Sequence, residues 1–132
     1  MDFDTKLEFE ALSEKWEVNS RAEDWRGCEA VAREMIRRFP GRVNGWNQLA
    51  HCLHKQGRTD EAHDTLLDVA PLFPCSSALL YNLAAYASLL HKLPEAHTWL
   101  EKALEQADSP EDLKALAMKD PDLKSMWDAL KT

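Results

Sequence analysis

The sequence is poor in glycine, in valine and isoleucine, and in positive charge. Its 132 residues include four glycines and six prolines, too few for a linker-like or collagen-like chain. Sixteen lysines and arginines stand against 23 aspartates and glutamates, and the net charge of −7 disfavours nucleic acid and anionic membranes as partners. With 45% apolar residues, the chain is too hydrophobic to be disordered. We therefore expect one folded domain.

Disulfide, secretion and membrane signals are also missing. The three cysteines, Cys28, Cys52 and Cys75, are an odd number without a C-x-x-C pair, which indicates reduced thiols. The first ten residues lack the basic and apolar segments of a secretory signal. No apolar run approaches the length that spans a bilayer. These absences predict a cytoplasmic protein without membrane association.

Apolar residues recur with helical spacing along nearly the whole chain. Over 46–53 they stand at i, i+3, i+4 and i+7, the spacing of one helix face. Valine- and isoleucine-rich alternation, which is typical of strands, is absent. Thr59, Ser109 and Asp120 each precede acidic residues, so we expect them to cap helix N-termini. The pattern predicts an all-α fold.

The chain repeats itself with a period of 34 residues. Phe-Pro at 39–40 recurs at 73–74, and Leu-Ala at 49–50 recurs at 83–84. The first helix of the earliest unit aligns best at a shift of 37, with Trp16 on Leu53. We therefore expect about three extra residues in the turn around 20–23, an insertion that costs little.

This pattern resembles the tetratricopeptide repeat family, whose unit is a 34-residue helix–turn–helix. The middle unit carries the matching residues Trp46, Leu49, Ala50, Leu53, Gly57, Ala62, Leu66 and Pro74. The resemblance implies a right-handed α-solenoid that forms a single domain over 1–132. Its repeats would cover 5–40, 43–76 and 77–108, with capping helices at 109–132. The first unit matches least well because of its insertion, and the third lacks the turn glycine.

The C-terminal segment 109–132 has the features of a cap. A short helix is expected at 111–118, and an amphipathic one from Pro121 onward. The apolar face of the second helix consists of Leu123, Met126, Trp127 and Leu130. A stacked array needs a terminal element with a polar outer surface, so we expect this face to cover the third unit.

In the tetratricopeptide family the first helix of each unit lines a concave groove that binds peptides, and the resemblance places the candidate site there. The side chains beside the core positions are Glu10, Glu14, Asn47, Gln48, His51, His54, Lys55, Tyr81, Asn82 and Ser88. The amides can pair with a peptide backbone because each offers a donor and an acceptor. Tyr81 would serve as an aromatic anchor. The competing interpretation is an ordinary solvated helix face.

Some family members grip a terminal carboxylate with lysine, arginine and asparagine, but this sequence departs from that pattern. Glu10 and Glu14 stand at the first-unit places, and Ala78 and Asn82 at the third-unit places. We therefore expect no such clamp. The glutamates favour a partner segment with basic character.

No pattern of catalytic or metal-binding residues stands out. His51 and His54 form an i, i+3 pair, yet a zinc site needs further ligands that the spacing does not supply. Phosphate-loop, dinucleotide-binding and nucleophile-elbow motifs are absent. We expect a non-catalytic protein-binding module without cofactor or metal, as a monomer or weak homodimer. The alternatives are a structural protein that self-associates with its groove empty, and an enzyme or metal site at His51 and His54.

Overall fold

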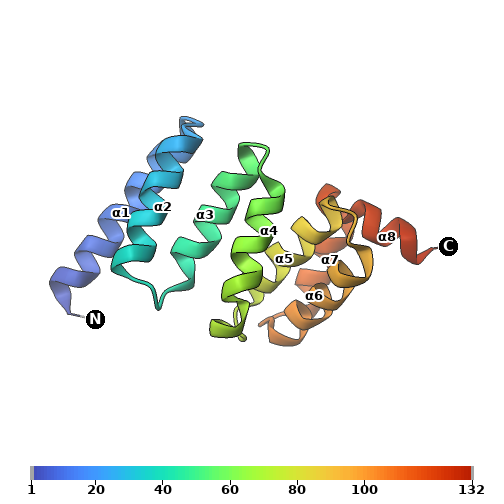
Figure 1. The fold of residues 1–132 in the computed structure, drawn as a ribbon. Coiled ribbons are helices and arrows are strands. Elements are labelled where there is room, and N and C mark those ends of the chain that lie inside the picture. Colours follow the sequence, from blue (N-terminus) through green and yellow to red (C-terminus); the bar gives the residue numbers. More distant parts are fainter. Residues whose placement is uncertain (1, 132) are drawn as a thin grey trace.

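The computed structural model describes residues 2–131, and helices account for nearly all of them (Figure 1). Within this range no β-strand occurs, so the predicted all-α class is confirmed. The α-helices are α1 (Phe3–Arg21), α2 (Trp25–Arg38), α3 (Val43–Lys55), α4 (Thr59–Val69), α5 (Ser77–Leu89), α6 (Leu93–Gln106), α7 (Pro110–Lys119) and α8 (Lys124–Leu130). Two short 3-10 segments, η1 (Ala70–Leu72) and η2 (Pro121–Leu123), follow α4 and precede α8.

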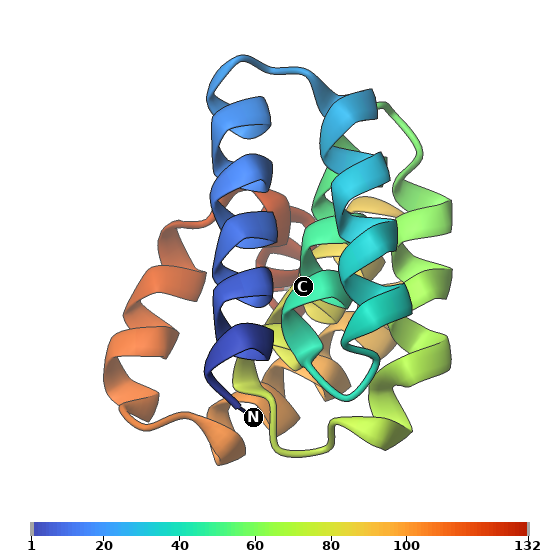
Figure 2. The same cartoon turned by 90° about the vertical axis from the view of Figure 1, so that its left-hand side faces the viewer.

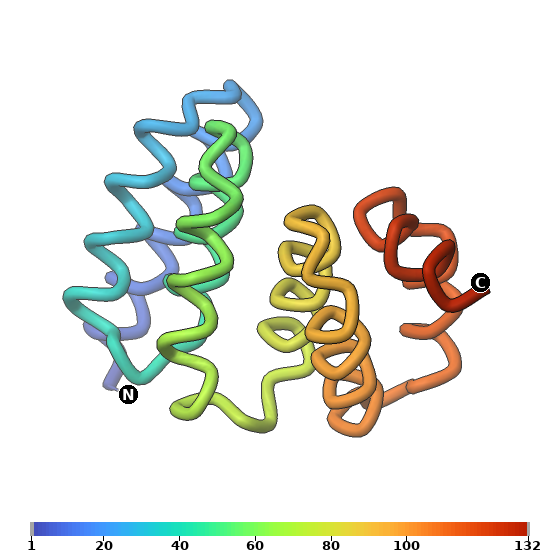
Figure 3. The backbone as a smooth tube through the Cα atoms, turned by 45° about the vertical axis from the view of Figure 1, so that its right-hand side comes forward, coloured from blue at the N-terminus to red at the C-terminus, as the bar shows by residue number. Residues whose placement is uncertain are grey.

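The first six helices form three hairpins, α1–α2, α3–α4 and α5–α6 (Figure 1). Neighbouring hairpins touch, because α2 packs on α3 and α4 packs on α5. The hairpins follow one another along the molecule in chain order, and the C-terminal helices come last (Figure 3). Each hairpin therefore finds its main contacts with its neighbours in sequence.

Small residues allow the helices to approach closely at the repeated positions. Ala50, Ala62, Ala84 and Ala96 are all fully buried. Large apolar side chains fill the space around them, namely those of Leu53, Leu66, Leu79, Leu83 and Leu100. One cluster of buried residues runs from α1 to α6, and a second joins α5 and α6 to the C-terminal helices.

The predicted insertion lies in a helix instead of a turn. Helix α1 has 19 residues and α3 has 13, whereas both hairpins turn over three residues, 22–24 and 56–58. The expectation of a longer turn around 20–23 is therefore wrong. The extra residues continue the helical hydrogen bonding of α1, which satisfies their backbone groups without a larger loop.

Of the three residues predicted to cap helix N-termini, one does so with its side chain. Asp120 accepts a hydrogen bond from the Asp122 amide at 2.9 Å. Ser109 occupies the cap position of α7, but its side chain makes no capping bond. Thr59 is the first residue of α4 and not its cap; its hydroxyl lies 2.8 Å from Nδ1 of His54 instead.

The C-terminal helices cover the third hairpin. Helices α7 and α8 pack on α6, and η2 and α8 contact α5. Leu123 and Met126 are buried there, and the half-buried Trp127 donates its indole N–H to the Ala117 carbonyl at 2.9 Å. Leu130 is 53% exposed, so its predicted place on the covered face is wrong. Leu130 is the last residue of α8, and it lines an open cavity together with Leu93 and Pro94.

Candidate functional site

The predicted site residues lie on the first helix of each hairpin. Viewed along the row of hairpins, α1 and α7 stand on one side and α2 and α4 on the other (Figure 2). We call the surface formed by side chains of α1, α3 and α5 the first-helix face. Its exposed or half-buried polar members are Glu10, Glu14, Asn44, Asn47, Gln48, His51, His54, Lys55, Tyr81 and Asn82.

Asn44 belongs to this face although the sequence interpretation missed it. It is exposed on α3 and precedes Gln48, His51 and Lys55 by four, seven and eleven residues, which places all four on one side of the helix. The signal was available, because the 34-residue shift aligns Asn44 with Ala78, a position already assigned to the groove.

Aromatic rings fix the two histidines of α3 toward different hairpins. The His51 ring centroid lies 5.8 Å from that of Trp16 and 5.5 Å from that of Trp25, both in the first hairpin. The His54 ring lies 5.4 Å from that of Tyr86 on α5. The two imidazoles therefore diverge, and they join α3 to its neighbours on both sides.

Burial sets the protonation of His51. Its desolvation lowers the pKa of the imidazole below the ordinary 6.5, and the nearby charges of Lys55 and His54 lower it further. His51 is therefore neutral at neutral pH and offers one ring donor and one ring acceptor.

The amides of α3 and α5 carry unmet hydrogen-bonding capacity. Oδ1 of Asn47 and Oε1 of Gln48 are buried and accept no hydrogen bond from the described residues. The half-buried Asn82 side chain also makes no hydrogen bond within residues 2–131. A buried carbonyl without a donor costs about 1–3 kcal/mol, so these positions favour an incoming N–H group.

Two predicted members on α5 require correction. Ser88 is 0% exposed, so it cannot contact a ligand on this face. Helix α5 is packed against α4, α6, η2 and α8, which leaves little of its surface open. Tyr81 was expected to serve as an aromatic anchor for a ligand, but its hydroxyl donates to Oδ2 of Asp120 at 2.6 Å. Burial and this hydrogen bond raise the pKa of Tyr81 above its ordinary value. Tyr81 therefore anchors the C-terminal segment.

A cavity of about 590 Å³ extends the face at the start of α5. Ala78 bounds it on α5, and Asp112, Leu113 and Leu116 bound it on α7. Leu116 is 59% exposed, which gives the cavity an apolar wall beside a carboxylate. Helix α7 thus contributes residues that were predicted only as a cap.

Two carboxylates of α1 have no ion-pair partner among residues 2–131. Glu10 and Glu14 are exposed and form no ion pair with any residue from 2 to 131. Of the arginines of α2, Arg33 pairs with Glu29 at 2.8 Å, Arg37 with Glu34 at 2.5 Å, and Arg38 with Glu8 of α1 at 2.5 Å. The uncompensated negative charge therefore remains on the α1 side of the first-helix face.

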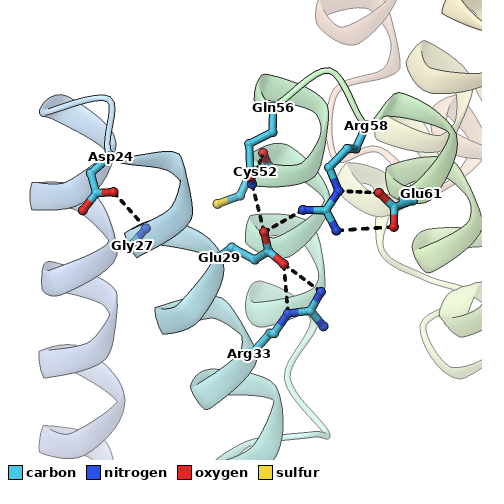
Figure 4. Close-up of polar contacts among 8 residues, drawn as sticks. All are labelled: Asp24, Gly27, Glu29, Arg33, Cys52, Gln56, Arg58 and Glu61. Atoms are coloured by element: carbon cyan, nitrogen blue, oxygen red, sulfur yellow. Dashed lines mark hydrogen bonds and ion pairs between the residues drawn. The ribbon is translucent and has the colours of Figure 1, made fainter.

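A polar network that the sequence interpretation missed holds the first two hairpins together (Figure 4). Glu29 on α2 accepts from Arg33 at 2.8 Å, from Gln56 at 2.9 Å and from Arg58 at 2.9 Å. Arg58 also pairs with Glu61 at the start of α4. Only the local spacings of Glu29 with Arg33 and Arg58 with Glu61 were visible in the sequence. The contacts of Glu29 with the α3–α4 turn depend on how the hairpins meet.

Replacing Glu29 by glutamine is expected to lower the free energy of unfolding by about 1 kcal/mol at pH 7. Burial raises the pKa of Glu29, but hydrogen bonds from Gln56 and Arg33 and the charge of Arg58 outweigh it and bring the pKa below 4.5. The difference in the free energy of unfolding between wild type and the variant is therefore fully present above pH 4.5. It disappears as the pH falls through the lower pKa that Glu29 has in the folded protein. Urea unfolding of both proteins from pH 7 to pH 3 measures this difference. The exposed Glu105 gives a control, since Glu105→Gln should leave stability unchanged at every pH.

The buried cysteines offer no reactive thiolate. Burial raises the pKa of Cys52 to about 12, and burial likewise raises the pKa of Cys28. The exposed Cys75 is also a free thiol. Within the described range, no group of three or more His, Cys, Asp or Glu side chains is arranged to hold a metal ion.

Comparison with family models and with curated proteins identifies no relative of the chain. No family model matches it, and no curated protein matches it either. None of the helices in residues 2–131 combines the length and the apolar character needed to cross a bilayer.

Proposed function

We propose that the chain is a tetratricopeptide-like array of three hairpins with a C-terminal cap. We further propose that its first-helix face binds an extended segment of a protein partner without catalysis. The 34-residue repeat, the hairpins packed in chain order and the fully buried alanines at equivalent positions support the array. The negative net charge supports a protein partner over nucleic acid.

The unmet amides of α3 carry this proposal. Asn47 and Gln48 each hold a buried carbonyl oxygen without a donor, at the centre of the row of hairpins. An extended peptide presents N–H and C=O groups in alternation, so it supplies the missing donors and uses the amide N–H groups as well. Asn82 on α5 would continue this pairing along the same face.

The charge of the face indicates the character of the partner segment. Glu10 and Glu14 on α1 and Asp112 on α7 bound the two ends of the face, and Lys55 is the cation among its predicted members. Lysine or arginine side chains of a partner would find uncompensated carboxylates at both ends. Such exposed charges contribute more to the association rate than to affinity.

The double variant Asn47→Ala/Asn82→Ala is expected to weaken peptide binding at least about tenfold, because both polar anchors of the backbone are lost. Peptides selected from a random display library on the wild-type protein would serve as probes, with affinities measured by calorimetry. Asn19→Ala removes an amide of α1 that lies beside Gly27 and Ala30 of α2 and is not a predicted site residue, so it should leave affinity unchanged. Equal affinity of the double variant and wild type would contradict the proposed site.

Exposed apolar residues on α1 favour self-association as the second candidate function. Phe3 is 74% exposed, Leu7 47% and Val18 54%, and they lie along one side of the helix. Sedimentation over a concentration series separates the two candidates. A dimer that dissociates on Leu7→Glu would support self-association.

A further inference from the structure

A cavity on the second-helix face, the surface formed by α2, α4 and α6, lies apart from the site described above. It encloses about 440 Å³ between the end of α4, η1 and α6. Leu80 forms part of its lining from α5, and Leu67, Ala70 and Pro71 line it from α4 and η1. Trp99 lines it from α6. The volume falls within the range of about 300–1,000 Å³ that is typical of ligand sites.

Contacts between the second and third hairpins hold the Trp99 wall in place. The Trp99 indole N–H donates to Oε2 of Glu95 at 3.2 Å. The same carboxylate oxygen lies 2.5 Å from Nε2 of His63, a side chain of α4 that is 1% exposed. Nζ of Lys102 lies 5.1 Å from the centroid of the Trp99 ring. The wall is thus fixed before any ligand arrives, which reduces the entropic cost of binding.

Carboxylates dominate the exposed sides of the two helices around this cavity. On α4, Asp60, Asp64 and Asp68 stand four residues apart, and all are exposed. On α6, Glu101 and Glu105 are exposed, and Lys102 is the one lysine or arginine of that helix. Arg58 at the start of α4 is paired with Glu29 and Glu61. The surroundings of the cavity therefore carry a net negative charge.

This charge identifies the kind of occupant that the cavity fits. A second copy of the chain carries a net charge of −7, so like charges oppose it. A positively charged segment is attracted by the same carboxylates. The lining itself is mainly apolar, with Leu67 38% exposed at the surface, so it favours a bulky hydrophobic side chain.

We propose that this cavity is a second docking site, which binds a basic amphipathic segment of a partner protein. One bulky apolar side chain of that segment enters between Leu67 and Trp99, and its lysines or arginines face the aspartates of α4 and the glutamates of α6. The site contains none of the polar residues assigned to the first-helix face, although Gln106 borders both this cavity and the one at the start of α5. The chain would accordingly engage two basic segments, one on each of its two faces.

The probe for this site is a synthetic amphipathic helix of lysine and leucine with one phenylalanine on its apolar side. A second peptide of the same charge, with alanine in place of leucine and phenylalanine, reports binding by charge alone. Calorimetry gives the affinity, and nitrogen-15 NMR shifts locate the contact. We expect saturable 1:1 binding of the first peptide, with shifts at Leu67 and at the Trp99 indole. Absence of saturable binding, or equal binding of the alanine peptide, would overturn the proposal.

The variant Leu67→Asp distinguishes binding through an apolar anchor from binding by charge attraction alone, because the two modes predict opposite changes in the affinity for the lysine–leucine peptide. The new carboxylate removes the apolar wall, so the proposal predicts at least about tenfold weaker binding. Charge attraction alone predicts equal or tighter binding. Leu72→Asp adds the same charge at a residue that is 70% exposed and lies outside the cavity lining, and it should not weaken binding. Equal or tighter binding by the Leu67 variant would refute the apolar anchor.

Two further measurements complete the test. Circular dichroism verifies that the Leu67 variant is folded, which is expected for a partly exposed position. Sedimentation tests whether a second copy of the chain occupies the cavity. A dimer that Leu67→Asp abolishes would assign the cavity to that second copy and overturn the proposal. Asn47→Ala/Asn82→Ala should leave the lysine–leucine peptide unaffected, so this inference and the proposed function can fail independently.

Discussion

Replacing Gly45 by leucine is expected to lower the free energy of unfolding by about 2 kcal/mol, because the first two hairpins meet at this glycine. A Cβ atom at this position would lie 3.0 Å from Cγ1 of Ile36, 3.2 Å from the Ile36 backbone nitrogen and 3.3 Å from Cβ of Met35. Overpacking of this kind costs about 1–3 kcal/mol or somewhat more. The better helix propensity of leucine offsets about 1 kcal/mol of that cost.

Gly41 provides a matched control for this measurement. It lies in the connection between α2 and α3, and a Cβ atom there would meet nothing within 4 Å. Urea unfolding followed by circular dichroism should therefore show a clear loss for Gly45→Leu and little change for Gly41→Leu. A Gly45 variant as stable as wild type would mean that α2 and α3 can separate at no cost, contrary to the close contact described.

Leu123→Asp is expected to detach the C-terminal helices, with a loss of about 3 kcal/mol or more in their docking free energy. Leu123 is 0% exposed, and its cluster consists of alanines of α5, Met126 and neighbouring apolar residues. No member of this cluster carries a positive charge, so a carboxylate there would lose its water without gaining an ion pair. Because the tail is held mainly by this cluster and by the Tyr81–Asp120 hydrogen bond, we expect it to open while the hairpins remain folded.

Amide hydrogen exchange resolves this local opening. In the Leu123 variant, protection should be lost in α7 and α8 but kept in α3, and the fluorescence of Trp127 should shift to the red. Met118→Asp makes the same chemical change at a residue that is 64% exposed, and it should leave the exchange pattern unchanged. Protection of α8 equal to wild type would show that Leu123 does not hold the tail.

The 34-residue period predicted the central hairpins well because a repeated sequence meets a repeated environment. Helices α3 and α5 are both 13 residues long and begin at Val43 and Ser77, one period apart. The alanines at 50 and 84 are both fully buried, as their small size and equivalent positions indicated. Periodicity therefore gave the helix positions and much of the core.

The parts that failed depend on contacts between segments distant in sequence. Nothing near Ser88 or Tyr81 in the chain reveals which elements pack around α5, so Ser88 was placed on an open surface and Tyr81 was assigned to a ligand instead of to Asp120. Glu29 likewise has an ordinary local partner in Arg33, while its contact with the turn at 56–58 arises only when two hairpins meet. The three extra residues of the first unit lengthen α1 by continuing its helical hydrogen bonds. The sequence alignment compared this unit with the shorter helix α3 and therefore placed the extra residues in the turn.

Among the helices of the three hairpins, α1 buries the fewest residues. Trp16 is its one buried residue, and the indole N–H lies 3.3 Å from Sγ of Cys52 on α3. When stability is a sum over neighbouring units, the terminal unit with the least burial opens first. Transient release of α1 would carry Glu10 and Glu14 away together and withdraw the Trp16 ring from His51. A peptide held by those glutamates would slow such opening, so occupancy should be measurable as increased rigidity at the N-terminal end.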